Sequence, residues 1–302
     1  MKIAVDFPSV AYREGPQQIL ALASAIEEIG YDEIAAFDHV VMGYPSETRR
    51  TIYPAEMPVL EALMLLANIA ATTSKISLST EVLVLPQRQP VLVAKQVSTL
   101  DTLSNGRVRL GVGVGWQDSE YDALEEDFSN RGKRMDEAID LLRSYWDGGR
   151  IEFRGDYYNS HDMGMEPTSP QGAKIPVWVG GESPAALKRT ACKADGWMAS
   201  GVTDEQALLC VAEIRRLAEE FGRDPSELGF QLMLQPPPRI AADKLFYADL
   251  DAVAERAAVV SAMGFDWTSV NATAIFQAGA RSVDAMIEQL EAIHTRIRKE
   301  VG

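Results

Sequence analysis

Hydrophobic and polar positions along the chain form two repeating patterns. Short, mostly apolar segments rich in β-branched residues predict buried strands at 2–8, 33–38, 75–85, from 107 onward, 175–179, 196–200, 229–234 and 267–272. Segments with an apolar residue every three or four positions predict helices at 15–30, 58–73, 91–103, 131–146, 184–194, 203–221, 250–263 and 283–298. This strict alternation of strand and helix predicts a parallel sheet covered by helices.

The number of strand–helix units fixes the expected architecture. Eight units in 302 residues are typical of a (β/α)8 TIM barrel, and a doubly wound sheet is the alternative. We expect one domain over residues 1–302, with insertions after strand 2, after strand 4 and after helix 4. The segment after strand 4, from 116 to 130, is expected to be a loop, and the last insertion, 147–174, to hold an exposed hairpin.

Three glycines mark the fourth strand. With a period of two, Gly111, Gly113 and Gly115 share one face of this strand, opposite Leu110, Val112 and Val114. Glycine weakens a strand, so either a ligand ring or a packed helix is expected to approach this face closely. A dinucleotide-binding fingerprint is excluded because the glycines lie within the strand rather than at a turn that opens a helix.

Composition limits the class of protein. The formal net charge of −15 argues against nucleic acid and anionic membrane surfaces as partners. No apolar run is long enough to span a membrane, and no secretory signal opens the chain. Cys192 and Cys210 have neither disulfide-framework nor zinc spacing. A cytoplasmic enzyme without a metal is expected.

The carboxyl ends of the strands are where a barrel of this kind places its chemistry. His39 follows Asp38 at the end of the second strand and precedes a long loop. Histidine can protonate or hydrogen-bond a reacting group near neutral pH, so His39 is the candidate catalytic residue. Asp38 and Glu81 could instead form an acid–base pair of the glycosidase kind.

The fifth strand ends in a candidate anion site. Gly180, Gly181 and Glu182 lead to Ser183 and Pro184, an N-cap and a first-turn proline. Flexible backbone that leads into a helix N-terminus favours a bound phosphate. The alternative interpretation of this segment is a helix cap that binds no ligand.

Several motifs together resemble the bacterial luciferase-like monooxygenase superfamily, and in particular its branch that uses coenzyme F420. They are Thr80–Leu83 with Pro86, Arg88 and Pro90, Ala94-Lys95, Thr99–Asp101, Ser104–Arg107 with Leu110–Trp116, Pro176–Ser183, and Asp195–Trp197. The resemblance covers most of the chain as far as the sixth strand.

The resemblance implies a (β/α)8 barrel that binds FMN or the deazaflavin coenzyme F420 over the strand ends. It places Asp38 and His39 beside the reactive ring, the phosphate and ribityl chain at Gly180–Ser183 with Ser200 and Gly201, and a non-prolyl cis peptide at Glu81–Val82. The expected cofactor-binding residues are Asp38, Thr80, Glu81, Val82, Gly113, Val114, Gly180, Gly181, Glu182, Ser183, Ser200 and Gly201.

Two departures from the family pattern guide the choice of cofactor and activity. Val114 stands where luciferases carry an arginine for the FMN phosphate, which favours F420. Trp116 stands where the sugar-phosphate dehydrogenases of the family carry a glutamate, which argues against that activity. Arg49, Arg50, Arg88 and Lys95 could supply positive charge for an anionic cofactor tail.

The resulting prediction is an oxidoreductase that transfers hydride between coenzyme F420 and a small organic substrate. The alternatives are an FMN-dependent monooxygenase that uses O2, a flavin-binding protein without turnover, and a cofactor-free lyase or hydrolase built on Asp38, His39 and Glu81. By resemblance, a homodimer is expected.

Overall fold

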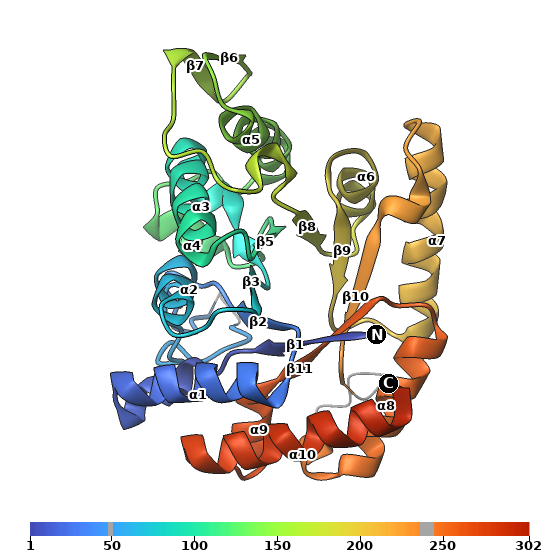
Figure 1. Ribbon diagram of the computed structural model, residues 1–302. Coiled ribbons are helices and arrows are strands. Elements are labelled where there is room, and N and C mark those ends of the chain that lie inside the picture. Colours follow the sequence, from blue (N-terminus) through green and yellow to red (C-terminus); the bar gives the residue numbers. More distant parts are fainter. Residues whose placement is uncertain (48–50, 236–244, 302) are drawn as a thin grey trace.

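The eight predicted strand positions close into a parallel barrel. A computed structural model describes residues 1–47, 51–235 and 245–301. Its main sheet has the order β3-β2-β1-β11-β10-β9-β8-β5-β4, neighbouring strands within it are parallel, and β3 also pairs with β5, which closes the sheet (Figure 1). Its strands are β1 (Lys2–Asp6), β2 (Glu33–Ala36), β3 (Ser77–Thr80), β4 (Leu83–Val84), β5 (Val108–Gly113), β8 (Val177–Gly180), β9 (Gly196–Ala199), β10 (Gly229–Met233) and β11 (Trp267–Asn271).

The predicted helices surround this barrel (Figure 1). They are α1 (Pro16–Ile29), α2 (Ala62–Ala70), α3 (Pro90–Ser104), α5 (Arg131–Asp147), α6 (Pro184–Lys193), α7 (Asp204–Glu220), α8 (Leu250–Ala262) and α10 (Val283–Val301). The cap signals seen in the sequence are confirmed: Ser183 Oγ accepts from Ala186 N, and Thr203 and Gln206 form a capping box. Within the described residues no helix is long and apolar enough to cross a membrane.

Several short elements have no clear signal in the sequence. Segment 116–130, predicted as a loop, contains the helix α4 (Asp118–Ala123), and α9 (Ala272–Ala278) follows β11. Neither is long enough for an apolar period to repeat. The same holds for the 3-10 turns η1 (Ser9–Glu14), η2 (Leu85–Gln87), η3 (Gly172–Lys174), η4 (Pro225–Glu227) and η5 (Phe246–Ala248). The predicted hairpin is confirmed as β6 (Ile151–Arg154) and β7 (Asn159–Met163), which lie beside α5 at the edge of the molecule (Figure 1).

Two predicted boundaries are wrong for local reasons. Helix α2 begins at Ala62 rather than near 58, because the Glu61 carboxylate caps it by accepting from Met64 N. The strand expected at 75–85 is interrupted between β3 and β4. Ser79 lies opposite Arg109 of β5, and Leu83 lies opposite Val112 of β5. The β3–β4 segment therefore holds one residue more than the stretch of β5 that it faces, as in a β-bulge.

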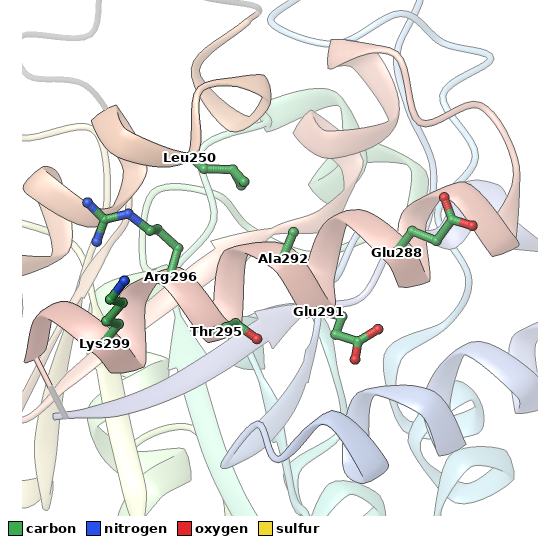
Figure 2. Close-up of a pocket in the computed structure, with 7 residues that line it drawn as sticks. All are labelled: Leu250, Glu288, Glu291, Ala292, Thr295, Arg296 and Lys299. Atoms are coloured by element: carbon green, nitrogen blue, oxygen red, sulfur yellow. The ribbon is translucent and has the colours of Figure 1, made fainter.

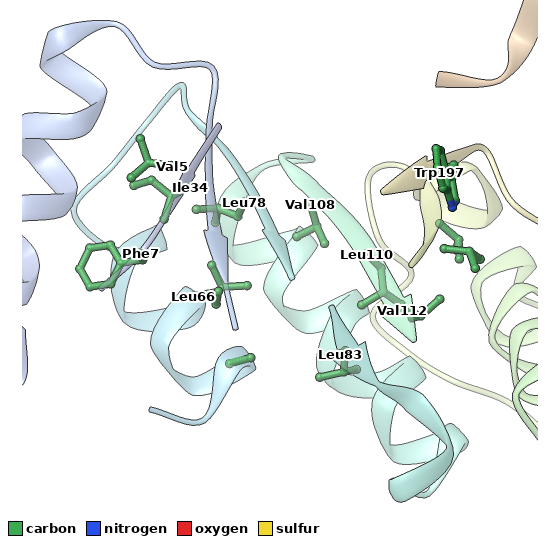
Figure 3. Packing of buried hydrophobic residues seen from close by; sticks show 14 of the residues in the cluster. Val5, Phe7, Ile34, Leu66, Leu78, Leu83, Val108, Leu110, Val112 and Trp197 are labelled. Carbon is green, nitrogen blue, oxygen red and sulfur yellow. The ribbon is translucent and has the colours of Figure 1, made fainter. Parts of the chain in front are cut away.

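The apolar core lies between the outer surface of the barrel and the helices. Leu78 lies beside Leu66 of α2, Leu110 and Val112 belong to the same cluster farther along the barrel wall, and all four are buried (Figure 3). Burying a leucine or valine side chain contributes about 1.5–3 kcal/mol, so this layer supplies the main driving force for closing the barrel.

The inside of the barrel is polar, contrary to the mostly apolar strands expected from the sequence. Arg109 lies at its centre, where its guanidinium binds Glu33 and Gln231 and stacks between the rings of Trp178 and Trp267, 4.2 and 4.4 Å from their centroids. A pattern of alternating apolar residues cannot show that such an ion pair fills the interior.

The glycine face of β5 points into this interior, and the interrupted strand β3–β4 packs closely against it. A Cβ added at Gly111 would lie 2.0 Å from the Thr80 carbonyl oxygen, and one at Gly113 would lie 2.6 Å from Val82 Cγ2. The close approach is therefore made by the interrupted strand β3–β4.

Candidate active site

Three aromatic rings meet above the carboxyl ends of β2 and β5. His39 lies 5.5 Å from Trp116 and 5.9 Å from Tyr53 between ring centroids, and Tyr53 lies 6.0 Å from Trp116. The contacts are edge-to-face, the geometry that aromatic quadrupoles favour. Tyr53 comes from the loop after β2 and Trp116 from the loop after β5, so the two insertions build one wall of the site together.

His39 is held by a buried carboxylate. Its Nδ1 lies 3.2 Å from Glu120 Oε2, and only 1% of the Glu120 side chain is exposed. Burial opposes ionisation of Glu120, but the hydrogen bonds from His39 and from the Val40 N–H outweigh it and lower the pKa of Glu120. Among the described residues, none bonds to the Nε2 atom of His39, which leaves that nitrogen for a ligand.

Asp38 ties the end of β2 to the interrupted strand. Its Oδ2 accepts from Val84 N at 2.8 Å and its Oδ1 from Arg88 Nη2 at 2.6 Å. Burial raises the pKa of Asp38, and the Arg88 charge offsets part of that rise. Because both oxygens are engaged, Asp38 positions the strand ends beside His39.

The ends of β8 and β9 lie side by side and expose backbone. Gly180 pairs with Met198 in the sheet, so the segments Gly180–Ser183 and Ser200–Gly201 are neighbours. Gly181 and Gly201 have φ of 107° and 72°, a backbone conformation that favours glycine. The α6 N-terminus begins here, and together these features suit an anion.

Val82 links the two glycine-rich strand ends. A Cβ at Gly113 would lie 2.6 Å from Val82 Cγ2, and one at Gly180 would lie 3.1 Å from Val82 Cγ1. Glycine at 113 therefore leaves the room that this half-buried side chain needs, and a Cβ at 180 would make a tight contact with it.

A family model described as luciferase-like monooxygenase matches residues 3–300. The chain belongs to the luciferase-like monooxygenase family. It is 35% identical over 211 residues to an uncharacterised protein of Mycobacterium tuberculosis, which covers 68% of this chain and 72% of that protein. It is also 34% identical over 175 residues to the pyrimidine monooxygenase RutA of Cronobacter sakazakii, covering 55% of this chain and 50% of RutA.

The barrel matches solved structures over its whole length. The coenzyme F420-dependent tetrahydromethanopterin reductase of Methanopyrus kandleri superposes with a TM-score of 0.76 at 18% identity, covering 100% of this chain and 99% of that one. At this identity the likeness shows the fold alone.

Within this luciferase-like barrel the Glu81–Val82 peptide bond is cis, as the resemblance implies. The Glu81 side chain turns into the barrel, where it accepts from Gln231 Nε2 at 2.8 Å and Ser269 Oγ at 3.0 Å. The Thr80 hydroxyl donates to the Gly111 carbonyl at 2.6 Å and is buried. The contacts that Thr80, Glu81 and Val82 are expected to make with the cofactor remain predictions.

The alternative acid–base pair of Asp38 and Glu81 finds no support in these contacts. Asp38 binds Arg88 and the Val84 N–H, whereas Glu81 binds residues of β10 and β11. Among the described residues the two carboxylates have separate hydrogen-bond partners.

The cationic side chains expected to bind a cofactor tail mostly pair with other groups of the chain. Arg88 pairs with Asp38 and Glu61, and Lys95 donates to the Glu166 carbonyl. Arg49 and Arg50 lie outside the described residues. Arg131, at the start of α5, forms no ion pair with the described part of the chain, and its Nε is buried without a hydrogen-bond partner there.

The sequence did not single out Glu120 and Tyr53 as site residues, although Tyr53 lies in the long loop after His39 and Glu120 in the segment 116–130. Tyr53 lies in a loop, and Glu120 lies on a helix too short to show periodicity. The only sequence signal for Glu120 is its place in an insertion that follows a strand end.

A hollow on the outer helix layer is not this site. It lies between α8 and α10 and has a volume of about 520 Å³. Figure 2 shows charged side chains of α10 spread along it, and Arg296 already pairs with Asp251 and Glu300. It contains neither a strand end nor His39.

A buried acid beneath the site gives a testable pH dependence. Burial and the neighbouring Glu81 charge raise the pKa of Asp6 well above its usual range. The folded chain thus keeps the Asp6 proton to higher pH than the unfolded chain, whose pKa is about 3.9, and stability falls as pH rises above that value. Asp6→Asn keeps a donor but cannot ionise.

We therefore expect Asp6→Asn to unfold in urea with a free energy on the order of 1–3 kcal/mol above that of the unchanged protein near pH 8. Near pH 4 the two proteins should be about equally stable. A variant that is less stable at both pH values would contradict this assignment.

Proposed function

We propose that this protein is an oxidoreductase that transfers hydride between coenzyme F420 and a small organic substrate. The observation that carries the proposal is the placement of His39. Its Nδ1 is held by a buried carboxylate, and its ring contacts the aromatic wall of Tyr53 and Trp116 at the carboxyl ends of the barrel strands. This is the edge of a barrel at which catalysis takes place.

The described residues fit a deazaflavin. Its phosphate would lie at Gly180–Ser183 and Ser200–Gly201, where left-handed glycines expose backbone beside the α6 N-terminus. Its ring would lie over Val82 and Gly113, near His39. Arg131, at the start of the neighbouring helix α5, pairs with no carboxylate among the described residues, and its guanidinium lies over the Phe128 ring and donates to the Phe128 carbonyl.

The chain's own contribution is orientation and proton handling. Coenzyme F420, when bound, supplies the hydride chemistry. His39 Nε2 would accept a hydrogen bond from the substrate and take up a proton there. Trp116 and Tyr53 would cover that contact and exclude water.

Val114 supports F420 over FMN. Its side chain is apolar where luciferases carry the arginine for the FMN phosphate, and its carbonyl accepts from Tyr121 Oη at 2.7 Å.

Fluorescence titration tests the choice of cofactor. We expect coenzyme F420 to bind the purified protein saturably, at least about tenfold more tightly than FMN, which corresponds to about 1.4 kcal/mol. Tighter binding of FMN would replace F420 with FMN in the proposal, and binding of neither would overturn it.

An FMN-dependent monooxygenase is the second candidate, favoured by the 34% identity to RutA, which is named a pyrimidine monooxygenase. An oxygen electrode distinguishes the two activities, because only the monooxygenase consumes O2 in step with substrate. A flavin-binding protein without turnover would bind cofactor yet oxidise or reduce no compound in a substrate panel.

The expected homodimer is a further proposal, which sedimentation velocity would test.

A further inference from the structure

The loop after β2 is attached to α4 at several points. Glu120 Oε1 accepts from Val40 N at 2.5 Å and from Val41 N at 3.2 Å, while its other oxygen, Oε2, faces His39 Nδ1. Gln117, one turn earlier, donates from Nε2 to the Val41 carbonyl at 2.8 Å. The two oxygens of Glu120 thus act separately, because Oε1 holds the loop backbone and Oε2 meets the imidazole.

The contact at Oε2 determines which ring nitrogen carries the proton. The pKa of Glu120 is lowered, so near neutral pH the group is a carboxylate that can only accept hydrogen bonds. His39 Nδ1 must then be the donor. In neutral His39 the Nε2 atom is left without a proton, as an acceptor on the side of the ring away from Glu120.

We propose that Glu120 is a positioning residue that fixes His39 in the Nδ1–H tautomer and so directs the Nε2 lone pair toward the substrate. The proposal rests on the function proposed above, in which His39 Nε2 contacts the substrate. A carboxylate that orients a histidine in this way controls catalysis without touching the substrate.

A purely structural role for Glu120 is the competing explanation, and Glu120→Gln separates the two. The glutamine can keep its oxygen at the backbone N–H groups of Val40 and Val41, so the loop remains attached. Its amide NH2 then takes the place of Oε2 and faces Nδ1. Because this group donates, Nδ1 must become the acceptor and the proton must move to Nε2.

Nitrogen NMR of histidine-labelled protein measures the tautomer directly. The chain has three histidines, so the spectrum is simple, and His39→Asn assigns the His39 signals. We expect Nδ1–H in the unchanged protein and Nε2–H in Glu120→Gln, with kcat lowered on the order of 10²-fold and the dissociation constant of coenzyme F420 within about twofold.

Two further variants complete the test. Asp122→Asn removes an exposed carboxylate from the same helix and should change neither tautomer nor kcat. Gln117→Ala loosens the loop and should leave the tautomer unchanged. If Glu120→Gln fails to fold, the spectrum of the unchanged protein decides alone.

Nε2–H in the unchanged protein overturns the proposal. So does an unchanged tautomer in a folded Glu120→Gln, even with reduced turnover, because the role of Glu120 would then be structural. The tautomer is measured without cofactor, so failure of the protein to bind any flavin would count against the proposed function and not against this measurement.

Discussion

Replacing His39 with alanine is expected to lower kcat on the order of 10²- to 10⁴-fold while the affinity for coenzyme F420 changes by less than about threefold. The imidazole contributes to the reaction through Nε2, whereas the cofactor tail is expected to bind at the ends of β8 and β9. Stopped-flow measurement of hydride transfer, together with a fluorescence titration, gives both quantities.

His161→Ala is the matched control for this prediction. His161 also pairs with a glutamate, Glu152, at 2.6 Å, but it lies exposed on the β6–β7 hairpin. Its removal should leave kcat unchanged. Full activity in His39→Ala would show that the chemistry lies elsewhere, and equal losses in both variants would point to a general effect on folding.

Gly111→Ala is expected to destabilise the protein by about 3 kcal/mol or more, enough to abolish soluble expression. The added Cβ would lie 2.0 Å from the Thr80 carbonyl oxygen and 2.7 Å from Met198 Sδ. Backbone atoms of a closed barrel cannot move aside as a flexible side chain can. Urea unfolding followed by circular dichroism measures the loss.

Gly132→Ala serves as the control for overpacking. Gly132 lies in α5, and a Cβ there would meet Arg189 Nη2 at 3.7 Å, an ordinary contact. Alanine also favours helix over glycine, so this variant should be as stable as the unchanged protein or slightly more so. Equal stability of the two variants would contradict the packing described for β5.

The barrel could be predicted from the sequence because its signals are local and repeated. Pro90, Ser183 and Thr203 mark helix starts, and each lies where predicted. The polar interior could not be predicted. Glu33, Arg109 and Gln231 come from three strands far apart in the chain, and only the closed barrel brings them together.

The site was predictable in part. His39 stood out because it follows a strand end, and its position at the carboxyl edge of the barrel agrees with that prediction. Its partner Glu120 did not stand out in the sequence, because contacts between two insertion loops depend on how both loops fold. The glycine face of β5 was recognised as a close approach, but its partner, the β3–β4 segment, was not.

The proposed function requires a deazaflavin to bind over the strand ends with its phosphate at α6. A crystal structure of the protein with coenzyme F420 would show whether it does. We predict the ring against Val82 with His39 Nε2 on its substrate side, and the phosphate within hydrogen-bond distance of the Gly181–Ser183 backbone. A ring bound away from Val82, or a phosphate held beside Val114, would contradict this placement of the cofactor.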